Sequence, residues 1–253
     1  MPAFPYLFAN SAFKINLTTI AMIFLTGLIV IVVLRLGVAR MDMRKPRGLQ
    51  NLIEWSAEFA TTMARDTMPN ERAVQFILPL AFTMLLFLLV ANWLGLIATI
   101  SLHFDHPIPL LGLTNEALQA GHGEVPLFDS PTANMSMTLG LAVMVWIISH
   151  ARGLRHPKIW FKHFFAPNPL GLIEEITNPL THGMRLYGNI FAGEALLSVM
   201  LNVPLFLGFI PASLPLVVIW LLYSGFVSTI QAYVFAILLC LYIGNKSFDE
   251  HAH

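Results

Sequence analysis

Five ionisable side chains fall within one predicted helix of an otherwise apolar chain, and their types favour proton chemistry. The five residues are Glu174, Glu175, His182, Arg185 and Glu194. A charge near the centre of a bilayer is costly, so an ionisable group in a membrane helix is a functional candidate by default. Arginine keeps its proton at every accessible pH, whereas a glutamate can relay protons when burial or a neighbour raises its pKa. The pattern predicts proton-relaying glutamates beside a fixed positive charge.

Helical geometry places these groups on two sides of the helix. At about 100° per residue, one polar stripe projects within about 60° of Arg185. The stripe contains Glu174, Asn178, His182, Arg185 and Asn189. Glu194 lies about 180° around the axis from Arg185 and roughly 13 Å further along it. The arrangement predicts two offset aqueous paths separated by the arginine. A moving carboxylate must come from another chain, because the other predicted membrane helices contain no acid.

The two glutamates at the start of this helix also have a simpler interpretation. Glu174 and Glu175 would lie near the headgroups, and acids are favoured at a helix N-terminus. Arg185 lies too deep for that interpretation, since it is over 20 Å into the helix at about 1.5 Å per residue. Asn92, Asn134 and Ser136 are expected to form hydrogen bonds between packed helices or to line the outer path.

Composition identifies the class of protein. Hydrophobic residues make up 57% of the 253 residues and charged residues 11%, whereas a soluble domain has about 25% charged residues. This excludes a cytosolic enzyme, a secreted disulfide scaffold and a disordered tail. The net charge is zero, with 14 Lys+Arg and 14 Asp+Glu, so nucleic acid is not an expected partner. The single cysteine, Cys240, can form no internal disulfide.

Apolar runs of about 20 residues predict an all-α integral membrane protein that forms a single membrane domain over 1–253. The first residues lack the basic region of a signal peptide, so the first helix is expected to be retained. Glycine and prolines divide the long last run into two helices. Five membrane helices are predicted, at 15–36, 75–99, 133–151, 170–202 and 213–243.

Loop charges predict the orientation. The segments 35–47 and 152–162 are rich in Arg and Lys, whereas 101–131 contains four acids and no Lys or Arg. By the positive-inside rule, the basic segments are cytoplasmic, the N-terminus is outside and the C-terminus is cytoplasmic. The basic residues are Arg35, Arg40, Arg44, Lys45, Arg47, Arg152, Arg155, Lys158 and Lys162.

The segment 48–68 has apolar residues at roughly helical spacing, interrupted by four charges. Such a helix is too charged to insert fully, so it is predicted to lie at the cytoplasmic interface as an amphipathic helix. A linker helix packed on a partner is an equal alternative.

The helix with the five ionisable groups resembles subunit a of the F-type ATP synthase, the stator proton channel. The resemblance is carried by the run Arg185-Leu-Tyr-Gly-Asn189-Ile-Phe-Ala-Gly-Glu194 and by the preceding residues from Glu174. A second element, Thr229-Ile-Gln231-Ala-Tyr-Val-Phe235, resembles the last helix of the family. Weaker matches begin at Gln50, Ala91 and Ser130, so the resemblance extends from about residue 47 to the end. It implies that the last two helices are long and tilted.

The resemblance implies roles for single residues. Arg185 would be the essential stator arginine facing a ring of c-subunits, which carry the carboxylate that this sequence lacks. Glu194 would belong to the outer half-channel, and Asn189 and Gln231 would be polar neighbours that line the path or hold Arg185. The candidates for the cytoplasmic half-channel are Glu174, Glu175 and His182.

One position departs from some relatives. Some relatives have His or Glu seven residues before the equivalent of Gln231. This chain has Ser224 at that position. A serine can hydrogen-bond or hold water there but cannot titrate. The outer half-channel is therefore expected to rely on Glu194 and water.

The resemblance also implies partners: the c-ring, the b-subunit of the stator stalk, the rest of the F1Fo ATP synthase and the lipid bilayer of a bacterial plasma membrane. ATP chemistry would occur in other subunits, because the sequence has no phosphate loop, nucleophile elbow or zinc motif. No catalytic residue, cofactor or metal is expected, and the irregularly spaced His103, His106 and His122 are taken as part of a solvated loop.

Three alternatives stay open. A self-contained ion-coupled secondary transporter would usually have inverted repeats, but the polar stripe has no counterpart in the first three helices. A structural scaffold with buried ion pairs would need Arg185 and Glu194 only for assembly. A sodium-translocating version of the same subunit is the third, because the c-subunit site mainly sets the ion.

Overall fold

The computed structural model describes residues 4–7, 15–39, 41–42, 47–97, 100–104, 106–108, 113, 115–120, 123–155, 157, 170–201, 205–206, 210–211 and 214–246. Some residues named in the sequence predictions lie outside this part: Arg40, Arg44, Lys45, His122, Lys158 and Lys162.

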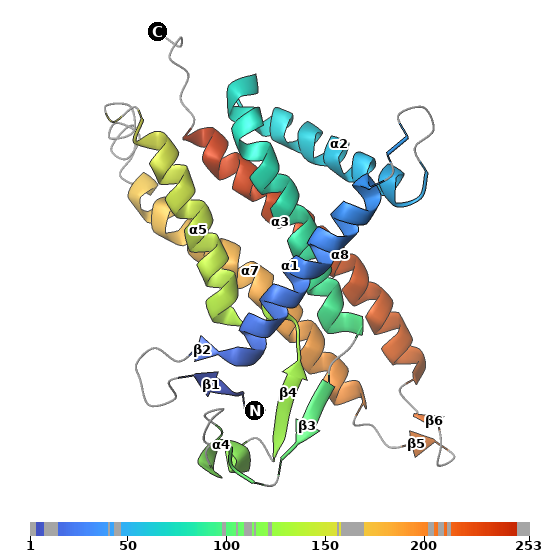
Figure 1. The fold of residues 1–253 in the computed structure, drawn as a ribbon. Helices are drawn as coiled ribbons and strands as arrows, with labels where there is room; N and C mark the ends of the chain where they lie inside the picture. The colour runs from blue at the N-terminus through green and yellow to red at the C-terminus, as the bar shows by residue number, and fades with distance from the viewer. Residues whose placement is uncertain are drawn as a thin grey trace.

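Long helices dominate the described structure, which is that of an all-α integral membrane protein (Figure 1). The long helices are α1 (Leu17–Val38), α2 (Leu49–Thr67), α3 (Glu71–Ile97), α5 (Met135–Gly153), α7 (Leu170–Leu201) and α8 (Leu214–Asn245). They occupy the predicted segments, with ends that differ by a few residues. Two short helices, α4 (Asn115–Ala120) and the 3-10 turn η2 (Pro131–Ala133), lie between α3 and α5.

Four of these helices, α1, α3, α5 and α8, are long and apolar enough to cross a membrane. Helix α7 has 32 residues and is long enough, but its four charged residues keep it outside that apolar group. About 20 residues span a bilayer, so α7 and α8, with 32 residues each, must tilt or extend beyond the hydrocarbon region.

Asparagines begin two of the membrane helices. Asn16 caps α1 by accepting a hydrogen bond from the Thr19 backbone N–H at 3.2 Å. Asn134 caps α5 by accepting from Ser136 N–H at 3.0 Å, and its amide donates to Thr19 Oγ1 at 3.1 Å. Asn134 therefore fixes the start of α5 and joins it to α1, which is the helix-packing role considered for it.

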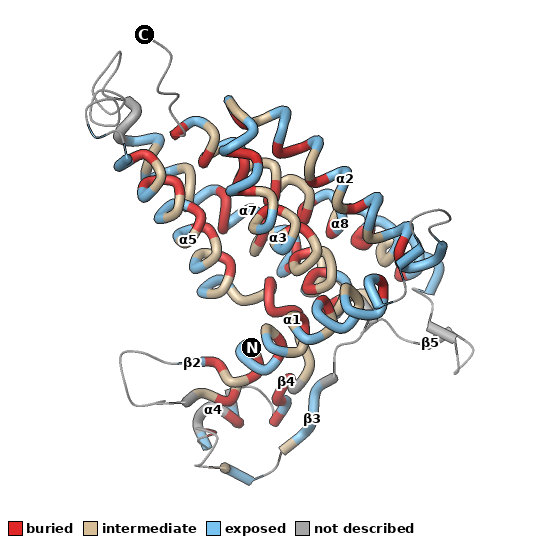
Figure 2. Tube along the Cα trace, turned by 45° about the horizontal axis from the view of Figure 1, so that its top comes forward, coloured by how far each residue is buried: buried red, intermediate tan, exposed pale blue. Residues whose placement is uncertain are grey.

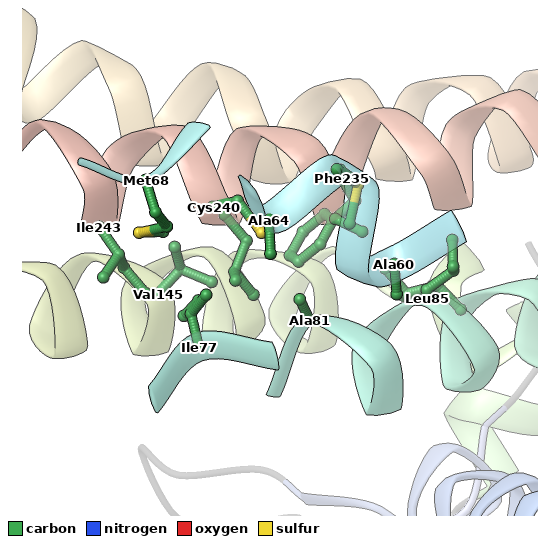
Figure 3. Packing of buried hydrophobic residues seen from close by; sticks show 14 of the residues in the cluster. Ala60, Ala64, Met68, Ile77, Ala81, Leu85, Val145, Phe235, Cys240 and Ile243 are labelled. Atoms are coloured by element: carbon green, nitrogen blue, oxygen red, sulfur yellow. The ribbon is translucent and has the colours of Figure 1, made fainter. Parts of the chain in front are cut away.

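Helix α2 packs against α3 and α8 of the same chain. Ala60 and Ala64 are fully buried because small side chains let α2 approach its neighbours closely, while Trp55 on the other face is exposed. Figure 3 shows this contact, in which Ala60 lies beside Leu85 of α3, and Ala64 lies near Cys240 and Phe235 of α8. The helix is amphipathic, with one face on the bundle and another face open.

Buried residues form the inner faces of the long helices, and exposed residues cover much of α1 (Figure 2). Many exposed side chains are large and apolar, as the surface of a membrane protein requires. Helix α8 has the most extensively buried window among the four apolar helices, so it is the central element against which α3, α5 and α7 pack.

Short strands form at one end of the bundle, opposite α2 (Figure 1). Three antiparallel pairs are present, β1 (Tyr6–Leu7) with β2 (Ile15–Asn16), β3 (Ile100–His103) with β4 (Glu124–Phe128), and β5 (Leu205–Phe206) with β6 (Ile210–Pro211). The segment after α3 is thus more structured than the solvated loop expected from sequence. Leu113, Leu118 and Val125 form a small apolar cluster there, because it contains enough apolar residues to bury.

Candidate functional site

The centre of α7 is joined to α8 by a side-chain amide pair. The Asn189 amide donates to Gln231 Oε1 at 2.8 Å, and Gln231 is buried in the interface between the two helices. The two residues are far apart in sequence and meet because α7 and α8 lie side by side. This confirms that they are neighbours on facing helices.

Arg185 lies one turn before Asn189 but is exposed on the surface of α7. Within the described residues, its guanidinium takes part in no ion pair. Large apolar side chains on the same side of the helix, Leu196 at 38% and Val199 at 66% exposure, are exposed as well. Arg185 is therefore a fixed cation in an open, mainly apolar surface.

His182 does not share that surface. It is 2% exposed, and its ring packs 4.0 Å from the Phe235 ring and 5.6 Å from the Tyr242 ring, measured between centroids. Its Nε2 is buried without a hydrogen-bond partner among the described residues. His182 therefore lies in the contact between α7 and α8, whereas Arg185, from the same predicted polar stripe, is exposed. The members of the stripe do not share one environment.

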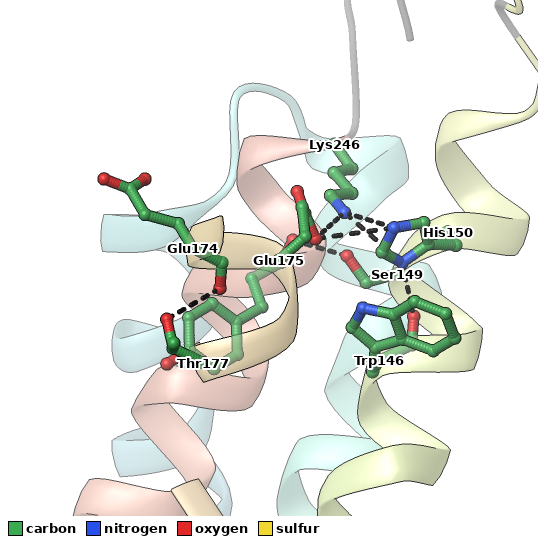
Figure 4. Close-up of polar contacts among 8 residues, drawn as sticks. Trp146, Ser149, His150, Glu174, Glu175, Thr177 and Lys246 are labelled. Atoms are coloured by element: carbon green, nitrogen blue, oxygen red, sulfur yellow. Dashed lines mark hydrogen bonds and ion pairs between the residues drawn. The ribbon is translucent and has the colours of Figure 1, made fainter. Parts of the chain in front are cut away.

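Glu174 and Glu175 point in different directions at the start of α7 (Figure 4). Glu175 Oε2 accepts from Lys246 Nζ at 2.6 Å, and it lies 3.4 Å from His150 Nε2. Lys246 Nζ also lies 2.9 Å from His150 Nε2. Glu174 is exposed and turned away from this cluster. The adjacent acids therefore have different environments, one ion-paired and one open.

The ion-paired cluster joins three helices. His150 is on α5, Glu175 on α7, and Lys246 follows the last residue of α8. Burial lowers the pKa of Lys246, and its hydrogen bond and attraction to Glu175 oppose this shift. His150 Nδ1 lies 2.9 Å from the Trp146 carbonyl oxygen, so a ring protonated at Nδ1 would leave Nε2 to accept from Lys246.

A cavity of about 110 Å³ adjoins this cluster at the end of the bundle near α2. Its polar lining consists of Ser149, Glu174, Glu175, Asn178, Asn245 and Lys246. This volume has room for several water molecules. The start of α7 therefore borders a small polar cavity that includes both glutamates.

A second cavity, of about 190 Å³, lies near the other end of α7. Its polar lining consists of Asn92, Asn189, Glu194, Tyr223, Ser224 and Ser228. Ser224 Oγ and Glu194 Oε1 are buried and have no fixed hydrogen-bond donor among the described residues. Glu194 and Ser224 are thus brought together in one cavity, as the sequence predicts for one half-channel.

Asn92 is held by two bonds in this cavity. Its amide donates to the Ser228 carbonyl oxygen at 3.1 Å, and its Oδ1 accepts from Thr132 Oγ1 at 2.8 Å. These bonds connect α3, η2 and α8, so Asn92 fixes the cavity wall.

The two cavities are separated along α7. Glu175 and Glu194 are 19 positions apart, which is about 28 Å at 1.5 Å per residue. Arg185 lies between them in the sequence of the helix. The geometry therefore provides two polar compartments at different depths, with a fixed cation at an intermediate level.

Comparison with known proteins identifies the family. A family model described as ATP synthase A chain matches residues 20–244. The chain belongs to the ATP synthase A chain family. Its relatives include ATP synthase subunit a of Oceanobacillus iheyensis, 35% identical over 246 residues, which cover 94% of this chain and 93% of the relative. ATP synthase subunit a of Enterococcus hirae is 36% identical over 240 residues, covering 90% of this chain and 91% of the relative. The resemblance inferred from the motif around Arg185 is confirmed.

Two members of the ion-paired cluster, His150 and Lys246, were not predicted as site residues from the sequence. Their meeting with Glu175 depends on the crossing of α5, α7 and α8. The one sequence signal is a lone lysine directly after the long last helix.

Proposed function

We propose that this chain forms two offset proton half-channels, one at each cavity, with Arg185 as the cation that separates them. Membership of the family establishes the protein as a non-catalytic membrane subunit of an ATP synthase and favours the channel function over a self-contained transporter. The observation that carries the assignment of residues is the pair of polar cavities at different levels of α7, with an exposed Arg185 between them.

In this proposal, protons from the outer side enter the cavity that contains Glu194 and Ser224. Glu194 passes each proton to a carboxylate on a neighbouring chain, and water held by Ser224 completes the path. After the carrier has moved, its carboxyl group loses the proton near Arg185, because a fixed positive charge favours the ionised form. Glu174 and Glu175 then lead the proton to the cytoplasm through the cavity that they line.

In this proposal, Asn189 and Gln231 keep α7 and α8 in a fixed position relative to each other. Their hydrogen bond fixes α7 to α8 one turn from Arg185, so the guanidinium keeps its level between the cavities. His182 contributes by packing rather than by lining the cavity that contains Glu174 and Glu175, since its ring packs against those of Phe235 and Tyr242.

The chain is part of the F1Fo complex, and we propose that its ring-facing surface is the exposed side of α7 and α8. That surface combines Arg185 with exposed apolar residues, including Val199 on α7 and Phe226 on α8. A ring of apolar helices, each with one carboxylate, would match both features. The b-subunit of the stator stalk is proposed as a further neighbour.

The protein is a multi-pass membrane protein, and we propose that it lies in a bacterial plasma membrane with its N-terminus outside. The orientation follows from the basic segments and from the acidic segment 101–131. Proton is the proposed ion; sodium is the alternative, since the site on the carrier chain sets the choice.

The test is ATP-driven acidification of inverted membrane vesicles that contain the Arg185→Ala variant. The proposal expects the variant complex to retain its ATPase subunits and to pump no protons. Arg65→Ala is the matched control, because Arg65 is exposed and pairs only with the exposed Glu71 in the described structure. An assembled Arg185→Ala complex that pumps normally contradicts the proposal. Failure of ATPase subunits to copurify with the wild-type chain would favour the transporter.

A further inference from the structure

Asp129 meets Glu194 although the two residues are 65 positions apart. Asp129 lies between β4 and η2, and its carboxyl group lies within interaction range of that of Glu194. The Asp129 Oδ1 atom also accepts from the Ser130 backbone N–H at 2.8 Å. The acidic segment before α5 thus brings a second carboxyl group to the edge of the cavity that contains Glu194.

The surrounding residues fix this pair in place. Ser130 is buried and its hydroxyl bonds to the Ala91 carbonyl oxygen at 3.1 Å, which anchors the residue next to Asp129 to α3. Gly95 of α3 packs against Ser130 and Glu194. A methyl group at position 95 would lie 2.5 Å from Ser130 Cβ and 2.7 Å from Glu194 Oε1.

The pair must hold a proton. Two carboxylates offer only acceptors, so two carboxyl groups at this range bond to each other only when one of them is protonated. No Lys or Arg occurs between residues 73 and 151, so the segment of Asp129 supplies no cation to balance two negative charges. Burial raises the pKa of Asp129, which its bond to Ser130 partly opposes. Like charges at close range therefore favour one shared proton.

Among the described residues, the lining of this cavity contains no acid besides Glu194. Asn92 faces it from α3, Ser224 and Ser228 from α8, and Asn189 from α7. Tyr223 of α8 is the other ionisable residue in the lining, and it is 54% exposed. Asp129 is therefore the second acid beside Glu194 at this end of α7.

We propose that Asp129 is a proton-relay residue that loads Glu194 from the outer side. This inference rests on the proposed function. An outer water or hydronium ion gives a proton to the Asp129 carboxylate, and the O–H of Asp129 transfers its proton to the Glu194 carboxylate. Asp129 returns to its ionised form and Glu194 becomes neutral, so charge and protons balance. Glu194 then delivers the proton to the cavity.

The test is proton-driven ATP synthesis as a function of outer pH in the assembled complex with Asp129→Asn. Loss of an acid–base group lowers the rate of a proton-transfer step by about 10²-fold. We therefore expect the rate of ATP synthesis to fall by roughly that factor where this step is rate-limiting. We also expect the outer pH of half-maximal synthesis to fall. Glu124→Gln is the matched control, because Glu124 is an exposed acid on the adjoining strand.

Three comparisons decide the outcome. If Asp129→Asn behaves like the Glu124→Gln control while Arg185→Ala is inactive, this inference is wrong and the proposed function stands. If Arg185→Ala is active, the proposed function itself fails. If the Asn variant does not assemble, Asp129→Ser, which also cannot titrate, replaces it, and an outer-pH profile identical to that of the wild type overturns the relay. The relay also predicts that Asp129→Asn adds little further loss to Glu194→Gln.

Discussion

Environment gives the same side-chain type different properties along α7. Glu175 has a lysine partner at 2.6 Å, whereas Glu194 has a carboxyl partner and a cavity. Arg185 takes part in no ion pair within the described residues and is exposed on the surface of α7. Glu175 thus has a cation beside it, and Glu194 has a second acid beside it. The two ends of α7 are therefore suited to different steps of transport.

Gly95 provides the first prediction at this scale. Gly95→Ala should lower ATP-driven proton pumping by about 10²-fold, because a new methyl group must displace the Glu194 carboxyl group by a fraction of an ångström or more. Pumping in inverted vesicles measures the effect, normalised to the amount of assembled complex. Gly140→Ala is the control, since a methyl group at that position meets no atom within 4 Å. Equal pumping by the two variants would contradict the assigned position of Glu194.

The sequence predicts the chemistry of single residues better than it predicts which residues lie next to them. Arg185, Glu194 and Gln231 are recognisable because their types are costly in apolar helices. The burial of His182 was not predictable from its angle on α7, since a residue about 60° from Arg185 can fall on either side of the helix contact. Which side it takes depends on the position of α8.

At the scale of elements, the contact between α7 and α8 determines the geometry of the site. Apolar runs predict the existence of both helices, because a bilayer requires continuous helical hydrogen bonding. The short strands were not predicted, since pairs such as β5 and β6 have only two residues each and depend on tertiary position. The acidic segment 101–131 was taken as a loop because its apolar residues show no regular period.

The bond between Asn189 and Gln231 provides a prediction for this contact. Gln231→Leu removes the acceptor of the Asn189 amide, at a cost of about 1 kcal/mol, and should let α7 shift relative to α8. We expect an assembled complex whose ATP-driven pumping is clearly reduced. Gln75→Leu on the exposed surface of α3 is the control and should pump normally. Normal pumping by Gln231→Leu would show that the bond does not hold Arg185 in place.

The cluster of His150, Glu175 and Lys246 provides a second prediction at the element scale. Lys246→Met should destabilise the junction of α5, α7 and α8 by about 2 kcal/mol, because it leaves a largely buried carboxylate without its cation. Faster amide hydrogen exchange in 146–150 and 242–245 would measure this loss. The double variant Glu175→Gln/Lys246→Met should recover part of the protection, since neither charge remains.

A control variant separates burial from charge in that experiment. Arg65→Met removes the exposed pair with Glu71, whose side chains are 60% and 65% exposed, and should cost below about 1 kcal/mol. Unchanged exchange in Lys246→Met would contradict a stabilising role for the cluster.

At the scale of the whole molecule, the protein is a membrane helical bundle with polar compartments near both ends of one long helix. Its composition and apolar runs predict the membrane class, and the motif from Glu174 to Glu194 predicts the family. The compartments themselves depend on contacts between distant segments, such as Asp129 with Glu194 and His150 with Lys246. No local pattern encodes such pairs, so they require the three-dimensional structure.

The central claim is that the two cavities open to opposite sides of the membrane, and cysteine labelling tests it most directly. In a background with Cys240→Ala, Ser224→Cys places a thiol in the Glu194 cavity and Asn178→Cys places one in the other cavity. A small membrane-impermeant thiol reagent is applied to right-side-out and to inverted vesicles. We predict labelling of position 224 only from the outside and of position 178 only from the cytoplasmic side. Labelling of both positions from one side would contradict the offset half-channels.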